Sequence, residues 1–267
     1  MPQFIDQIGH HIHLNKIPKR IISLVPSQTE FLWDIGLRDE LVGITKFCVH
    51  PKELLNTKTI IGGTKRLNIE KIKALKPDLI IGNKEENEKE QITELQKEFN
   101  VWMSDIYTLN DALKMMKDLA EIIGKQKEEQ LISAQIKSDL LSIKNNFQSK
   151  RVAYFIWNKP YMLAGQNTFI DDVLNHLGFV NACGNLVRYP EISQEELIQL
   201  NPEICLLSSE PFPFKNKHIQ EIKTFLPYTK VNIVDGEMFS WYGSRLLHLK
   251  KYVQALTQFN SFRSSKA

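Results

Sequence analysis

Long apolar runs are missing from this sequence of 267 residues. No stretch reaches the about 18 consecutive apolar residues of a membrane-spanning helix, so no such span is expected. The net charge is only +3, with 34 Lys and Arg against 31 Asp and Glu, which gives no reason to expect nucleic acid or an anionic membrane as partner. The opening residues 1–10 lack the basic start and apolar core of a secretory signal. We therefore expect either a cytoplasmic protein or an exported one whose signal is absent from this sequence.

Cysteines are few, odd in number and widely spaced. The three residues, Cys48, Cys183 and Cys205, include no C-x-x-C pair, so the sequence indicates neither a disulfide framework nor a zinc site. Cys205 lies in an apolar strand pattern and is interpreted as a buried thiol that packs like a small hydrophobic side chain. The disulfide state of the three is left open.

Common catalytic motifs are also absent. The sequence holds no G-x-G-x-x-G, G-x-x-x-x-G-K-[ST], H-E-x-x-H or G-x-S-x-G. Gly62–Lys65 has the composition of a phosphate loop without its spacing, so we interpret it as a turn. His10–His13 has no acidic or cysteine partner nearby and is interpreted as a polar N-terminal edge. We expect no metal site and no catalytic residue.

An alternation of short β-rich segments with helical patterns fills both halves of the chain. Apolar residues make up 42% and charged residues 24%, as in a soluble globular protein with a substantial core. Strands separated by helices predict parallel βαβ units. The predicted strands are 20–25, 41–47, 59–62, 78–81, 101–105, 151–157, 161–164, 203–207 and 231–234. The predicted helices between them are 29–35, 69–75, 88–99, 169–177, 195–200, 219–225 and 243–256.

Two longer helical patterns interrupt this alternation near the middle. Residues 109–123 and 126–147 carry apolar side chains at helical spacing, with Gly124 as the stop between them. The second is about 30 Å long at about 1.5 Å per residue, enough to cross a small domain. We predict an N-terminal α/β lobe over 1–108, a connecting helical segment over 109–148 and a C-terminal α/β lobe over 149–267. The final residues 260–267 are expected to be a frayed tail.

An internal repeat connects the two halves. Glu70–Ile80 aligns without gaps on Glu195–Cys205, and both segments read as a short helix, a proline stop and a buried strand. The offset of 125 residues is nearly half the chain. The predicted fold is therefore α/β, with two similar lobes that have mostly parallel sheets, one long backbone helix joining them, and a ligand cleft between them.

The repeat pairs two acidic residues. Glu70 and Glu195 each follow a predicted N-cap, Asn68 and Ser193, in the first turn of a helix. They either satisfy the helix dipole or dock onto basic residues of a partner.

Aromatic residues gather after predicted strands of the second half. Phe239–Gly243 lies between a strand and the last helix, where rings either enter the core or line a cleft for a flat conjugated ligand. Trp33 and Trp102 are predicted to be core residues. His50 is the histidine expected to face the cleft.

Five segments in order along residues 20–256 resemble ABC-transporter substrate-binding proteins of the vitamin B12, siderophore and haem class. Phe47–Pro51 and Phe239–Gly243 are most similar to the cobalamin-binding branch of that class. The five segments are Arg20–Glu30, Leu41–Cys48, Ile69–Ile80, Ala164–Asp171 and Phe239–Trp241.

The resemblance implies a monomeric periplasmic receptor that binds a corrinoid such as cobalamin and delivers it to an ABC permease dimer. Cobalamin would be the ligand, with no catalytic cofactor. Glu70 and Glu195 would then engage the permease, one on each lobe. An iron–siderophore or haem receptor of the same class is one alternative, and a cytoplasmic chelatase or corrinoid-handling enzyme is another. The expected ligand contacts are Ser27, Gln28, Phe47, Trp157, Trp241 and Tyr242.

Overall fold

The computed structural model describes residues 3–258, and these form two compact units. The first unit contains the described residues up to Ile106, together with Asn110–Ile136 and Tyr242–Arg245. The second contains Tyr107–Leu109, Lys137–Trp241 and the described residues from Leu246 onward. The predicted boundaries after residues 108 and 148 stay predictions. The tail predicted over 260–267 lies outside the described residues.

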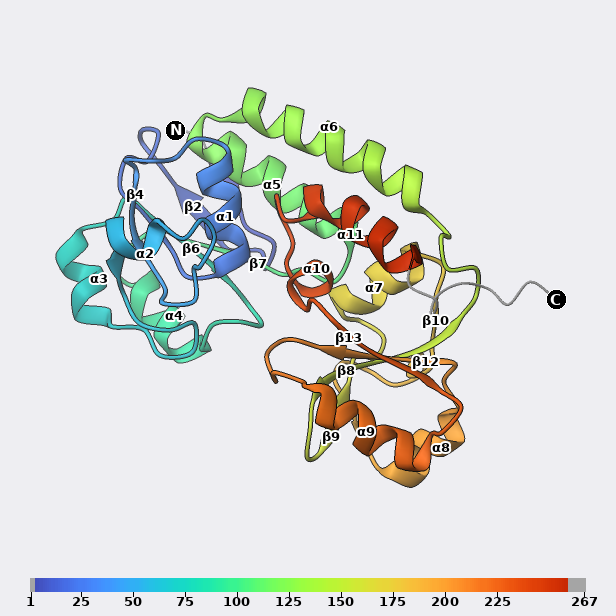
Figure 1. Ribbon diagram of the computed structural model, residues 1–267. Helices are drawn as coiled ribbons and strands as arrows, with labels where there is room; N and C mark the ends of the chain where they lie inside the picture. Colours follow the sequence, from blue (N-terminus) through green and yellow to red (C-terminus); the bar gives the residue numbers. More distant parts are fainter. Residues whose placement is uncertain (1–2, 259–267) are drawn as a thin grey trace. The chain divides into compact units, whose positions relative to one another are not determined.

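The first unit is built on five parallel strands in the order β5-β4-β3-β6-β7, of which β4, β6 and β7 are labelled in Figure 1. Short apolar segments rich in Ile, Leu and Val form these strands, and the three central ones are almost completely buried, as expected of a parallel sheet. The strands are β3 (Ile21–Ser23), β4 (Leu41–Ile44), β5 (Thr59–Ile60), β6 (Leu79–Asn83) and β7 (Val101–Ser104). The helices are α1 (Pro26–Asp34), α2 (Leu54–Thr57), α3 (Ile69–Leu75), α4 (Lys89–Gln96) and α5 (Leu109–Ile123).

An antiparallel hairpin of β1 (Gln3–Ile5) and β2 (His11–His13) precedes this sheet and was not predicted. The Asp6 carboxylate closes the hairpin turn by accepting from the His10 backbone N–H at 2.7 Å. Its other oxygen accepts from the N–H of Met103 at 3.1 Å, which fixes the hairpin to the outer strand β7. The polar edge expected over His10–His13 is therefore part of an ordered strand whose Ile12 is buried.

The second unit contains a six-stranded sheet in the order β11-β9-β8-β12-β13, with β10 also pairing with β8. β8, β10, β12 and β13 run parallel, whereas β9 pairs antiparallel with both of its neighbours, β8 and β11, so the sheet is mixed. The strands are β8 (Arg151–Trp157), β9 (Tyr161–Leu163), β10 (Val180–Asn181), β11 (Glu191–Ile192), β12 (Ile204–Ser208) and β13 (Lys230–Val234). The helices are α7 (Phe169–His176), α8 (Gln194–Leu200), α9 (Asn216–Phe225), α10 (Glu237–Ser240) and α11 (Leu246–Gln258).

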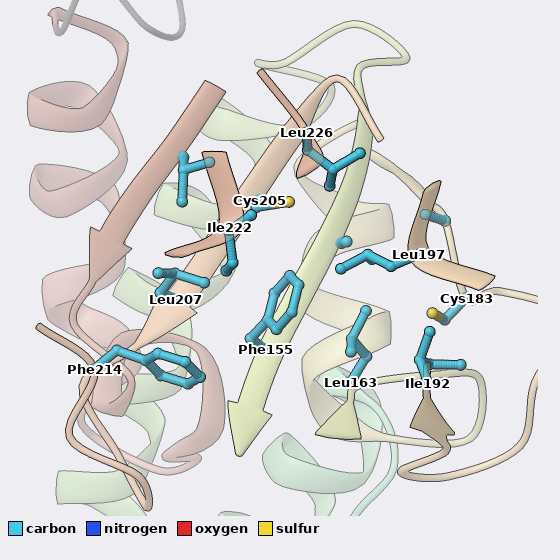
Figure 2. Close-up of a cluster of buried hydrophobic side chains, with 13 residues drawn as sticks. Phe155, Leu163, Cys183, Ile192, Leu197, Cys205, Leu207, Phe214, Ile222 and Leu226 are labelled. Atoms are coloured by element: carbon cyan, nitrogen blue, oxygen red, sulfur yellow. The ribbon is translucent and has the colours of Figure 1, made fainter. Parts of the chain in front are cut away.

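The core of the second unit lies between this sheet and its helices. Figure 2 shows Phe155 projecting from β8 among Leu163, Ile222 and other apolar side chains. Cys183 and Cys205 belong to the same buried cluster. All three cysteines are buried free thiols, which confirms the interpretation of Cys205.

A single long helix, α6 (Gln126–Ile143), belongs to both units. Residues up to Ile136 fall in the first unit and those from Lys137 fall in the second. The prediction of one long connecting helix is confirmed, although it ends at Ile143 and not at residue 147. No described helix is both long and apolar enough to cross a membrane.

The sequence repeat is also a structural repeat. Helices α3 and α8 each have seven residues, begin at side-chain N-caps (Asn68 and Ser193) and end in left-handed residues at corresponding positions. Each helix leads through a proline into an interior parallel strand of its unit, β6 or β12. Both units therefore repeat a helix–strand step with the same caps.

Side-chain contacts extend this repeat to the starts of β3 and β8. The Arg20 guanidinium donates to the carbonyl of Leu75, and the Arg151 guanidinium donates to the carbonyl of Leu200, 125 residues further on. The strand–helix packing of the two units is thus fixed by the same type of contact. The two similar α/β lobes predicted from the sequence are confirmed at this level.

Three predictions at or near aromatic residues were wrong. The last helix begins at Leu246 and not at Gly243, because Gly243 has a φ of +91°. The short helix α10 takes in Phe239 and Ser240, which were expected in a loop. Trp33 is half-buried and not a core residue, since its ring stacks under the Arg38 guanidinium at 3.7 Å from the ring centroid. Trp102 is fully buried, as predicted.

Candidate functional site

The carboxyl ends of parallel strands are where α/β units bind ligands, most often where the strand order reverses. In the first unit the reversal lies between β3 and β6, because β4 and β5 extend to one side and β6 and β7 to the other. Pro26 opens α1 directly after β3, which places Ser27 and Gln28 at this point. Ser27 and Gln28, two of the predicted ligand contacts, thus lie at the carboxyl end of the sheet, where a ligand is expected to bind.

Gln28 is completely buried and connects α1 to two strands. Its amide nitrogen donates to the carbonyl of Gly82 at 3.1 Å and to the hydroxyl of Ser104 at 2.7 Å. The amide oxygen has no hydrogen-bond partner among the described residues. In this conformation Gln28 holds the edge of the sheet together, and its contact with a ligand stays a prediction.

Tyr242 is brought to the same place by a short segment of the first unit. Burial, followed by the charge of Glu86, raises the pKa of its phenol far above the usual value, while hydrogen bonding to Ser27 and Ser104 partly opposes the shift. Ser27 is itself buried. The structure therefore gathers three of the predicted contacts, Ser27, Gln28 and Tyr242, around Ser104.

The segment 242–245 that carries Tyr242 is fastened to helix α1. Gly243 passes so close that a Cβ atom there would lie 3.2 Å from Cβ of Phe31. Arg245 forms a buried ion pair with Glu30, with Nη2 2.8 Å from Oε1 and Nε 3.0 Å from Oε2. Each of the two side chains is only 9% exposed. This ion pair is the anchor that keeps Tyr242 in the first unit.

Phe47 follows β4 and is 48% exposed. The Lys46 ammonium lies 5.0 Å from its ring centroid, and a Cβ atom on Gly63 would lie 3.2 Å from the ring. Phe47 thus gives the first unit an exposed apolar surface. Its ring lies so close to Gly63 that a side chain at that position would press against the ring. No interaction described for this ring joins it to the cluster around Ser104.

Aromatic side chains occupy the carboxyl ends of the strands in the second unit. Trp157 ends β8 and is 40% exposed. Its ring meets Phe212 in a T-shaped contact, with centroids 5.5 Å apart. Phe212 comes from the loop after β12, so neighbouring strands of one sheet bring the two rings together.

Trp241 is half-buried and hydrogen-bonded to the loop that carries Phe212. Its indole Nε1–H donates to Oε1 of Glu210 at 2.9 Å, and the hydroxyl of Ser240 donates to the same oxygen at 2.9 Å. Burial raises the pKa of Glu210, and the nearby carboxylates of Glu237 and Asp235 raise it further. The second unit therefore combines exposed ring surface with a partly desolvated carboxylate.

Glu70 and Glu195 lie away from these strand ends, in the first turns of α3 and α8, and both are exposed. Their N-caps are formed as predicted, since Asn68 accepts from the N–H of Lys71 and Ser193 from that of Glu196. The two carboxylates thus occupy corresponding surface positions of the two units. Their docking to a partner stays a prediction.

Histidine provides no metal site among the described residues, because no group of three or more His, Cys, Asp or Glu side chains is placed to hold an ion. His50 is half-buried, before Pro51. Its place in a ligand site stays a prediction.

Sequence reasoning assigned no individual role to four polar or aromatic residues at these strand ends: Ser104, Ser208, Glu210 and Phe212. The repeat contained a signal for one of them, since adding 125 to Glu85 gives Glu210, directly after the corresponding strand. Ser104 carries no sequence signal, because it is recognised only through its contacts with Gln28 and Tyr242.

The chain matches the family model described as "Periplasmic binding protein" over residues 21–226. It is 28% identical over 211 residues to "Uncharacterized ABC transporter substrate-binding lipoprotein YvrC" of Bacillus subtilis, a match that covers 74% of this chain and 66% of the relative. It is 27% identical over 200 residues to "Vitamin B12-binding protein" of Vibrio parahaemolyticus, covering 73% of this chain and 72% of the relative.

Solved structures share the fold at lower sequence identity. The periplasmic vitamin B12 binding protein BtuF of Vibrio cholerae matches with a TM-score of 0.76 at 23% identity, over 91% of this chain and 99% of that one. The haem-binding protein RhuT from Roseiflexus sp. RS-1 has a TM-score of 0.79 at 18% identity, covering 92% and 99%. The siderophore-binding protein BauB has a TM-score of 0.79 at 19% identity, covering 95% and 97%.

Proposed function

Because the chain belongs to the periplasmic binding protein family, we propose that it is the substrate-binding component of an ABC importer and that its ligand is a corrinoid. The ligand would be held by residues at the carboxyl ends of the parallel strands and delivered to a permease dimer. The observation that carries the corrinoid assignment is the chemistry of the second unit, where exposed ring surface lies beside the carboxylate of Glu210.

Ring surface and carboxylate suit different parts of a corrinoid. The exposed face of Trp157 can bury macrocycle surface, which is the main source of affinity for a large apolar ligand. A carboxylate accepts hydrogen bonds from amide N–H groups, which corrinoids carry around the ring, and it repels the carboxylates of haem and of many siderophores. The names of the curated relatives that bind vitamin B12 support the same choice.

A haem or iron–siderophore ligand is the second candidate, and one cluster favours it. The Arg188 guanidinium lies 5.2 Å from the ring centroid of Tyr107 and 5.4 Å from that of Tyr189. An arginine held between aromatic rings is a suitable partner for an anionic ligand group. The fold match to the haem and siderophore receptors is as close as that to the vitamin B12 receptor.

Calorimetric titration of the purified protein with cyanocobalamin, hemin and ferric enterobactin distinguishes these candidates. The proposal predicts saturable binding of cyanocobalamin with the highest affinity of the three. If hemin or ferric enterobactin bound more tightly than cyanocobalamin, the corrinoid assignment would be wrong and the ligand would be of the haem or iron–siderophore class. A protein that binds none of them but inserts metal into a tetrapyrrole would be an enzyme, against this proposal.

Docking to the permease is proposed for Glu70 and Glu195, because they occupy corresponding exposed positions of the two units. Glu70→Lys and Glu195→Lys should each weaken binding to the permease–ATPase complex in nanodiscs about tenfold or more, since charge pairs at an interface become repulsive. Glu121→Lys, on the exposed surface of α5, is the charge-matched control. If all three substitutions weakened binding to the permease–ATPase complex equally, Glu70 and Glu195 would have no specific role in docking.

A further inference from the structure

The loop that follows β12 is fixed at its start by contacts with two neighbouring strands. The hydroxyl of Tyr154 on β8 donates to Oγ of Ser208 at 3.3 Å. The N–H of Ser209 donates to the carbonyl of Val234 at the end of β13, at 2.9 Å, and Oγ of Ser209 accepts from the N–H of Gly236 at 3.0 Å. The loop therefore leaves the sheet in a defined direction.

Glu210 uses this fixed position to hold Trp241. An indole has a single N–H donor, and here it donates to a carboxylate oxygen, a type of hydrogen bond that is about twice as strong as a neutral one. Ser240 donates to the same oxygen and thereby fixes the carboxylate as well. Gly236 leaves the necessary room, since a Cβ atom there would lie 2.7 Å from Cγ of Glu210.

Phe212, two residues further along the loop, packs against Trp157. The ring planes are inclined at 66°, so the edge of one ring meets the face of the other. Phe212 is supported from behind by Phe214 at 4.8 Å and by His218 at 5.3 Å between ring centroids, and both of these are buried. The position of Trp157 thus depends on a side chain that is itself held by the core.

We propose that residues 209–214, here called the positioning loop, set the orientation of both tryptophans of the second unit, with Glu210 holding the indole of Trp241 and Phe212 holding the ring of Trp157. Glu210 and Phe212 are positioning residues: Phe212 acts on the ligand only through Trp157, whereas Glu210 holds Trp241 in addition to presenting its carboxylate to the ligand. Their effect on affinity rests on the proposed function, because it requires that the two tryptophans contact the ligand. Their effect on the rings does not.

Indole ¹H–¹⁵N spectra of the full chain without ligand test the first step. The sequence has four tryptophans, and single Trp→Phe variants assign the four indole resonances. In Glu210→Ala the Trp241 resonance should move upfield, because its proton loses a charged acceptor. In Glu210→Gln, which keeps an acceptor oxygen, it should move less. Glu237→Gln removes a neighbouring charge while leaving the carboxylate of Glu210 in place, and serves as the control for a change in local charge alone.

Calorimetry with cyanocobalamin tests the second step on the same proteins. Glu210→Ala and Phe212→Ala should each weaken binding about tenfold, the loss expected for one displaced ring contact. Glu210→Gln should recover part of the loss. Tyr228→Ala, at a side chain that is 98% exposed, should have no effect.

An unchanged Trp241 resonance in Glu210→Ala overturns the role of Glu210. A moved resonance with unchanged cyanocobalamin affinity overturns its importance for binding. If the unsubstituted protein binds none of cyanocobalamin, hemin and ferric enterobactin, the proposed function fails, and the indole resonances alone decide whether the loop positions the rings. Should Glu210→Ala not fold, as judged by circular dichroism, the comparison of Glu210→Gln with Glu237→Gln decides the same question.

Discussion

Replacing Trp157 by alanine should remove a large share of the ligand affinity. The side chain is 40% exposed, and a tryptophan presents about 250 Å² in total, so about 100 Å² of ring surface is available to a ligand. At about 25 cal/mol per Å², burying that surface contributes about 2.5 kcal/mol, which corresponds to a factor of about 70 in the dissociation constant. The buried remainder of the ring packs on Phe212 and contributes to folding.

Calorimetric titration with cyanocobalamin measures the effect directly, and urea unfolding of the same sample shows how much of the change arises from lost stability. Tyr228→Ala is the control, because it removes an aromatic ring that is 98% exposed. A loss of affinity below threefold in Trp157→Ala, with the protein folded, would refute the reasoning that this ring contacts the ligand.

Three further predictions concern the ion pair, the thiols and a buried phenol. Arg245→Met leaves Glu30 buried without its cation and should lower the free energy of unfolding by about 3–5 kcal/mol in urea, whereas the double variant with Glu30→Leu should recover most of it. Because burial raises the pKa of Cys183 to about 11 and all three cysteines are buried, Ellman's reagent at pH 8 should label no thiol in the folded protein and three in denaturant. Burial, together with the charge of Glu221, raises the pKa of Tyr161 from 10.0 to about 12. Its contribution to stability is therefore complete below pH 10 and is lost as the pH rises toward 12, so Tyr161→Phe should flatten the loss of unfolding free energy over that interval.

Much of the fold was predictable because periodicity and caps are local signals. The bounds of α3, α5 and β8 were predicted correctly to the residue, since each is delimited by a cap, a glycine stop or a turn within a few residues. The repeat of Glu70–Ile80 in Glu195–Cys205 also predicted two similar units, and the matching caps confirm it.

Other elements depend on contacts that are distant in the chain. The hairpin of β1 and β2 is held by the hydrogen bond from the backbone N–H of Met103 to the carboxylate of Asp6, almost 100 residues away in the chain. No local sequence pattern predicts this hairpin. The antiparallel strand β9 was predicted over 161–164, whereas β11, with two residues, is too short to carry a period and was not predicted. Segment 242–245 is kept out of the last helix by Gly243 and by the ion pair of Arg245 with Glu30, which is 215 residues distant.

In the candidate site, too, some residues were predictable from local sequence and others depend on contacts that are distant in the chain. Aromatic residues next to strand ends directed attention to Trp157 and Trp241, and the structure places both at the carboxyl end of the second sheet. The carboxylate of Glu210 was assigned no role from the sequence, because its hydrogen bond with Trp241 is formed only in the fold. Gln28 was predicted as a ligand contact from its place after β3, and the structure adds that its amide spans Gly82 and Ser104.

The corrinoid assignment is tested most directly by equilibrium titration of the purified full chain with cyanocobalamin, followed by calorimetry and by the corrin absorption bands. The proposal predicts one saturable site per chain, with tighter binding than for hemin or ferric enterobactin. No heat and no spectral change at high micromolar cyanocobalamin, with the protein folded, would contradict it.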